Sequence, residues 1–124
     1  MGSMNKVILL GNLGNAPEYK QLASGQTLLK FSLATRSVWR DKQNPSKQNE
    51  RTDWHRVVVW GPRATRLSTM LQRGQRVVVE GSIRHNTVHD EAGGKRTYTD
   101  IVADNIQFAD SVTQRRGETP AQVS

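Results

Sequence analysis

The sequence predicts an all-β domain that carries one short helix. Apolar residues occur in short runs or in alternation with polar ones, which is typical of strands with a buried face. Clusters of Gly, Pro and Asn separate these segments, as expected for turns. Only one segment has apolar residues at helical spacing, and 124 residues suffice for one domain with its own core.

The first two strands are expected in Asn5–Asn12 and Gly25–Ser37. Asn5–Asn12 is an apolar run closed by a glycine, and the turn residues of "GNLGNAPE" follow it. Gly25–Ser37 alternates, so Leu29, Phe31 and Leu33 are expected to point inward.

A long polar loop, Val38–Arg51, is expected before the third strand, Thr52–Gly61. Loops of this length are uncommon unless they have a function. Alternate residues of a strand share a face, so Trp54, Arg56 and Trp60 are expected on one side of the third strand. The opposite side would carry His55, Val57 and Val59.

The helix is expected in Gly61–Gly74, with Pro62 in its first turn and Gly74 as its C-terminal cap. Two more strands are expected in Gln75–His85 and Lys95–Ala109, with a hairpin between them. The inward residues would be Ala64, Leu67 and Leu71 in the helix and Val77, Val79 and Ile83 in the fourth strand.

This order of elements predicts an OB-fold, a five-stranded, partly open Greek-key barrel with one short helix between strands 3 and 4. The domain would span residues 4–109. We expect residues 1–3 to be an expression scar and residues 110–124 to be a polar, disordered stub of a C-terminal linker.

The charge of the chain indicates a polyanionic partner. Eighteen Lys and Arg against eleven Asp and Glu leave a net charge of +7, which favours nucleic acid. A membrane partner would require a basic amphipathic helix, and neither that nor a membrane-spanning run or secretory signal is found. The chain has no cysteine, so we expect a reducing, cytoplasmic and nucleoid-associated location. A basic surface kept for solubility is the alternative.

Tryptophans beside basic residues are the residue types that unpaired nucleic acid requires. Aromatic rings stack on any base, and cations displace the counterions of phosphates. The candidate stacking residues are Trp39, Trp54 and Trp60. The candidate phosphate ligands are Arg36, Arg40, Lys42, Arg56, Arg84, Lys95 and Arg96. The alternatives are that the tryptophans belong to the core and that the basic residues form a solvated face.

Four segments, "NKVILLGNLGNAPE", "FSLATRSVWRDK", "TDWHRVVVWG" and "VVVEGSIR", closely resemble the DNA-binding core of the bacterial single-stranded-DNA-binding protein family. The resemblance runs from Asn5 to Phe108. It implies an OB-fold, a homotetramer and single-stranded DNA as partner. It also implies that Trp39, Trp54 and Trp60 occupy base-stacking positions, and that His55 lies toward subunit contacts.

Two departures from the family pattern stand out. Val88 replaces a tryptophan that the family often has, so a stacking contact is expected to be lost or moved, and Tyr98 could supply a ring nearby. Family members usually end in an acidic tip that recruits partner proteins. The sequence ends in "RRGETPAQVS", so docking through such a tip is not expected.

No catalytic, cofactor or metal site is expected. No Ser–His–Asp or paired-carboxylate pattern occurs, and the i, i+4 spacing of His85 and His89 does not converge on a strand. We therefore expect a non-enzymatic protein that binds and protects single-stranded DNA in replication, recombination and repair. The alternatives are a dimeric OB-fold accessory protein of replication restart (primosomal), a structural protein with tryptophans in an oligomer interface, and, with least support, a nuclease.

Overall fold

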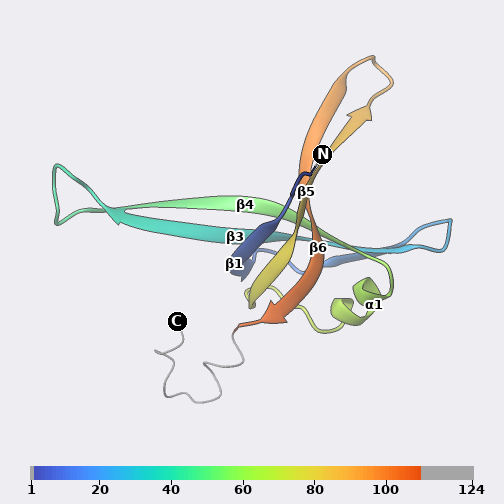
Figure 1. Cartoon of the computed structure of the whole chain (residues 1–124), viewed down its shortest axis with the longest axis horizontal. Helices are drawn as coiled ribbons and strands as arrows, with labels where there is room; N and C mark the ends of the chain where they lie inside the picture. Colours follow the sequence, from blue (N-terminus) through green and yellow to red (C-terminus); the bar gives the residue numbers. More distant parts are fainter. Residues whose placement is uncertain (1, 110–124) are drawn as a thin grey trace.

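The computed structural model describes residues 2–109 and confirms the predicted OB-fold (Figure 1). The predicted stub, 110–124, lies outside the described residues. Within residues 2–109, no helix is long and apolar enough to cross a membrane. The elements are β1 (Val7–Leu13), β2 (Glu18–Gln21), β3 (Thr27–Arg40), β4 (Gln48–Trp60), α1 (Pro62–Ser68), β5 (Arg76–His89) and β6 (Lys95–Phe108).

Five strands close the barrel, in the order β1-β5-β6-β4-β3 and back to β1. Two of the seams are short. The parallel seam between β4 and β6 consists of Val57↔Ile101 and Val58↔Val102, and β1 meets β3 only at Asn12↔Ala34 and Leu13↔Leu33. The remaining strand, β2, was not predicted. Its four residues are all exposed and lack apolar alternation, and they pair with the edge of β3.

The core lies inside this barrel and follows the predicted alternation. Leu29, Phe31 and Leu33 of β3 are buried, as are Val57 and Val59 of β4. Val58 is buried as well, although its parity places it on the outer side. The remaining buried hydrophobic residues of the core cluster are Leu13, Ala64, Leu71, Val77, Val79, Ile101 and Ala103.

A register shift on β6 keeps apolar residues pointing inward along its whole length. Glu80 pairs with Asn105 and Gly81 with Ala103, so Asp104 is an extra residue. Before it, Ile101 and Ala103 face the core, and after it Ile106 and Phe108 do. On β5, Ile83 is 38% exposed rather than buried, because β5 leaves the barrel there.

The helix is shorter than predicted and ends at Ser68, so Gly74 does not cap it. The Ser68 and Thr69 hydroxyls donate to the carbonyls of Thr65 and Arg66, at 2.7 and 3.0 Å. Such side-chain bonds compete with continuation of the helix. Gly74 has a φ of 87° and lies in the turn before β5, where its N–H donates to the carbonyl of Leu13.

The β3–β4 and β5–β6 hairpins extend beyond the barrel as long arms (Figure 1). The β3–β4 arm is paired without interruption from Leu28↔Trp60 to Arg40↔Gln48. The predicted loop Val38–Arg51 is therefore wrong over much of its length, and only residues 41–47 connect the strands. Outside the barrel there is no core to impose an apolar alternation, so polar strands resemble a loop in sequence. The β5–β6 arm is paired out to His89↔Lys95.

Candidate nucleic-acid interface

The three tryptophans all lie on the surface. The exposed fractions are 63% for Trp54, 48% for Trp39 and 42% for Trp60. Covering exposed apolar ring surface with a partner is favourable, because it removes that surface from water. None of the three therefore belongs to the core, and each offers ring surface to a ligand.

Strand register places Trp54, Arg56 and Trp60 on the outer face of β4, as predicted. Their cross-strand partners on β3 are Ala34, Ser32 and Leu28, and residues directly opposite each other share a face. Trp39 pairs with Asn49 and so belongs to the opposite face of the β3–β4 ribbon. Sequence reasoning did not separate these two faces.

Gly14 supports the ring of Trp54. A Cβ atom at position 14 would lie 3.0 Å from Cη2 of the indole and closer still to Cζ3. Real Cβ atoms are very rarely found so near another atom, so only glycine allows the ring its place. The turn is fixed to β3, since Gly14 N–H donates to the Ser32 carbonyl at 2.9 Å. The Ser32 N–H donates to Asn15 Oδ1 at 3.0 Å.

Sequence reasoning missed this role of Gly14. The motif "GNLG" contains the residue, but its partner lies 40 positions away. No local signal connects them. Only the pairing of β1 with β3 and of β3 with β4 brings the turn under the indole.

Arg56 contacts Asp100 and Tyr98 of the β5–β6 arm. Its Nε lies 2.9 Å from Oδ1 of Asp100, a carboxylate that is 5% exposed. The guanidinium lies 4.7 Å from the centroid of the Tyr98 ring, within cation–π range. Asn86 Nδ2 donates to the other carboxylate oxygen of Asp100 at 2.7 Å. Arg56 therefore joins β4 to the arm, and Tyr98 has one face covered by it.

A shallow pocket of about 260 Å³ opens on the Trp54 side of the sheet. Its lining is polar and includes Ser32 and Arg56 from the outer face of the β3–β4 ribbon. The other residues that line it are Asn15, Glu18, Lys30 and Phe31.

The remaining basic candidates are distributed along the two arms. Arg36 forms an ion pair with Glu50 at 3.5 Å, and both side chains are exposed. Arg40 ends β3 and Lys42 lies in the connection after it, while Arg84 is on β5 opposite Asp100. Lys95 and Arg96 begin β6 opposite His89 and Val88. The structure does not gather these cations into one patch.

His55 lies on the face opposite Trp54 and is partly buried. Its Nε2 is 2.8 Å from the Thr35 hydroxyl. Among residues 2–109, no group of three or more His, Cys, Asp or Glu side chains is placed to hold a metal ion. Val88 is 53% exposed on the β5–β6 arm.

Comparison with known proteins identifies similar sequences and structures. Residues 4–109 match the model of the Single-strand binding protein family. Single-stranded DNA-binding protein 1 of Chlorobaculum tepidum is 37% identical over 98% of this chain and 74% of its own length. Single-stranded DNA-binding protein 1 of Xylella fastidiosa strain 9a5c is 38% identical over 87% of this chain and 79% of its own length.

Among solved structures, Plasmodium falciparum SSB in complex with ssDNA superimposes with a TM-score of 0.78 at 33% identity. The match covers 89% of this chain and 98% of that one.

Proposed function

This chain belongs to the single-strand binding protein family, and we propose that it binds single-stranded DNA with little sequence preference. It is a DNA-binding protein and not an enzyme. We propose that it protects unpaired strands during replication, recombination and repair, in the cytoplasm and associated with the nucleoid.

The observation that carries the proposal is the exposure of Trp39, Trp54 and Trp60. Stacking on an aromatic ring contributes about 1–3 kcal/mol per base and does not depend on base identity. Trp54 and Trp60 are six residues apart on one strand face, which corresponds to about 20 Å. In this proposal the DNA strand follows the outer face of β4 between Trp54 and Trp60. Trp39 binds the DNA where the DNA reaches the β3–β4 arm.

Basic side chains would supply the attraction for phosphates. Arg40, Lys42, Lys95 and Arg96 are exposed, and none has a side-chain hydrogen bond or ion pair within residues 2–109. They are therefore better phosphate ligands than Arg36 and Arg56, which already face carboxylates. Arg84 is a further candidate at the base of the β5–β6 arm.

We also propose a homo-oligomer, a tetramer. Support comes from β1, which pairs with β5 along Val7–Asn12 but meets β3 only at its end. The outer side of β1 exposes Ile8 by 61% and Leu10 by 46%. A strand with one unpaired edge and an apolar outer side favours addition of a second copy. His55, on the face away from Trp54, would lie toward another subunit.

Titration with oligo-dT tests the function, and native mass spectrometry tests the assembly. We expect quenching of tryptophan fluorescence and a log–log decline of affinity with salt, with a slope set by the phosphates contacted. Unchanged fluorescence at saturating DNA and low salt would contradict DNA binding. A dimer mass would contradict the tetramer and favour the replication-restart alternative.

A further inference from the structure

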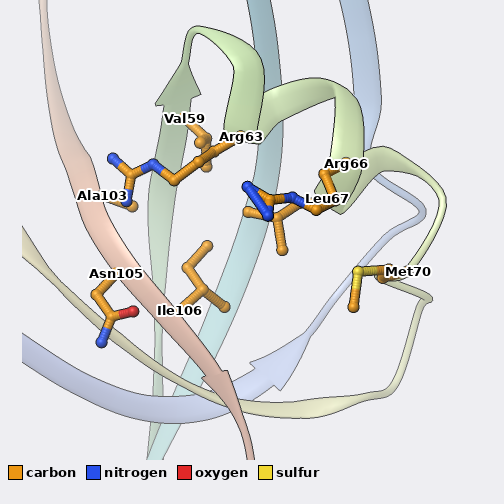
Figure 2. A pocket seen from close by; sticks show the side chains of 8 residues that line it. All are labelled: Val59, Arg63, Arg66, Leu67, Met70, Ala103, Asn105 and Ile106. Carbon is orange, nitrogen blue, oxygen red and sulfur yellow. The ribbon is translucent and has the colours of Figure 1, made fainter.

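A second concave site lies between α1 and β6 (Figure 2), on the face of β4 opposite to Trp54 and Trp60. Its volume is about 200 Å³. The residue that β4 contributes is Val59, whose parity is opposite to that of Trp60. The other lining residues are Arg63, Arg66, Leu67, Met70, Ala103, Asn105 and Ile106.

The shape of this site follows from the register shift on β6. Ala103 and Ile106 both face inward, but Asp104 is inserted between the pairs at Ala103 and Asn105. A bulge of this kind bends the strand locally. We attribute the space left between β6 and the helix to this bend. Ala103 is small, and a larger side chain there would fill it.

The rim of the site carries two arginines without anionic partners. Arg63 and Arg66 are three residues apart on α1, so their side chains share one side of the helix (Figure 2). Within residues 2–109, neither guanidinium has a hydrogen bond or an ion pair. Two neighbouring cations repel each other, and an anion placed between them would relieve that repulsion. Glu80, whose Oε1 accepts from Asn105 Nδ2 at 3.4 Å, forms no ion pair with either arginine within residues 2–109.

The floor of the site is aliphatic. Val59, Leu67, Ala103 and Ile106 provide no aromatic ring on which a nucleobase could stack. An apolar cavity of roughly 150 Å³ is sufficient to hold a benzene-sized group, so this site has room for one apolar side chain. A ligand that fits must combine an apolar group with more than one negative charge.

We propose that this site binds a short acidic peptide segment of a partner protein. One apolar side chain of the segment enters between α1 and β6, and flanking carboxylates pair with Arg63 and Arg66 through charge-assisted hydrogen bonds. Because the site lies on the face of β4 opposite to Trp54 and Trp60, peptide and DNA are bound at the same time. The protein would thereby hold a partner without releasing the strand.

Fluorescence anisotropy with a labelled peptide, Asp-Asp-Leu-Asp-Asp, tests the proposal on the full chain. We expect R63A/R66A to weaken peptide binding by about tenfold or more and to leave oligo-dT affinity within about twofold. R73A is the matched control, because Arg73 is an exposed arginine outside the lining. It should leave peptide binding within about twofold as well.

Two further comparisons separate a specific site from general attraction to a basic protein. A peptide with alanine in place of leucine should bind more weakly by about tenfold. A103M, which fills the floor but retains both arginines, should also weaken peptide binding, with circular dichroism confirming the fold. If R63A/R66A binds the peptide like the unaltered chain, the proposal is overturned. It is also overturned if that variant loses oligo-dT and peptide binding equally, since the site would then belong to the DNA path.

Discussion

The two ends of the β3–β4 hairpin differ in how their side chains are held. At the barrel, the Trp54 ring rests against Gly14, and Arg56 is fixed by Asp100 and Tyr98. On the arm, Trp39 is on the other face of the ribbon. Arg40 and Lys42, also on the arm, have no side-chain partner within residues 2–109. Groups that are already ordered lose less conformational entropy on binding. The barrel end is therefore suited to strong, fixed contacts, and the arm to weaker, adaptable ones.

The largest expected effect is on stability and concerns Arg56. R56A leaves the buried Asp100 carboxylate with Asn86 as its remaining partner, and orphaned buried charges are costly. We expect a loss of about 2–4 kcal/mol in the free energy of unfolding, measured by urea denaturation. R36A, which breaks the exposed pair with Glu50 on the arm, should cost no more than about 0.5 kcal/mol. Equal losses in the two variants would remove the distinction between barrel and arm.

A second substitution sharpens this result. If the loss arises from the uncompensated carboxylate, R56A/D100N should be more stable than R56A alone, because the buried charge is then absent. If the double variant is as unstable as the sum of the single variants, the lost packing of Arg56 on Tyr98 would be the cause instead.

The next largest effect is on DNA affinity. We expect W54A to weaken oligo-dT binding by about 1–3 kcal/mol per subunit, with the native mass unchanged. W39A should weaken it less, because an exposed ring on the arm must be ordered on binding. An equal or larger loss for W39A would contradict the comparison. Dissociation of the assembly by W54A would favour a tryptophan-lined subunit interface.

A smaller effect on DNA affinity is expected for Gly14, which lies against the Trp54 indole. G14A adds a methyl group where the Trp54 ring lies, so the ring must move away from its stacking position. We expect a loss of about 1 kcal/mol in oligo-dT affinity. The control is G25A, because a Cβ atom at position 25 would meet open space. G25A should leave oligo-dT affinity unchanged, although the φ of 96° at this position means that the variant protein is less stable. If G14A has no effect on DNA affinity when W54A does, Gly14 has only a structural role.

The smallest effect is a gain. V88W places a ring at a half-exposed site on the β5–β6 arm, the position at which the sequence resemblance led us to expect a tryptophan. Because the arm position is less ordered, we expect an improvement in oligo-dT affinity of no more than about 1 kcal/mol. If V88W does not improve oligo-dT affinity at low salt, the bound DNA lies away from the β5–β6 arm.

Patterns governed by local geometry were predictable from the sequence. The inward set of Leu29, Phe31 and Leu33 and the shared face of Trp54 and Trp60 follow from the period of a strand, and the structure confirms both. The order of strands and helix was sufficient to predict the OB-fold. The end of α1 was mispredicted, because Ser68 and Thr69 bond to the preceding turn and stop the helix before Gly74.

Features that depend on distant partners were not predictable. In the sequence, Asp100 is one of several scattered acidic residues. Only the parallel pairing of β4 with β6 brings it to Arg56. The site between α1 and β6 depends on a one-residue register shift at Asp104, which leaves no mark in the residue pattern. The β3–β4 arm was mistaken for a loop for a different reason, since strands that extend beyond the core have no apolar alternation.

The short parallel seam between β4 and β6 has a consequence for motion. Backbone pairing there is limited to two register positions, and the Arg56–Asp100 ion pair lies one residue before the first of them on both strands. The Arg56–Asp100 ion pair thus adds a side-chain contact to the short backbone pairing of β4 with β6. Thermal opening of the barrel should begin at its two short seams, β4–β6 and β1–β3, since few bonds oppose it there. Where the β4–β6 seam opens, the β5–β6 hairpin would swing relative to β4, the strand that carries Trp54 and Trp60, while the long β3–β4, β5–β6 and β1–β5 ladders remain intact.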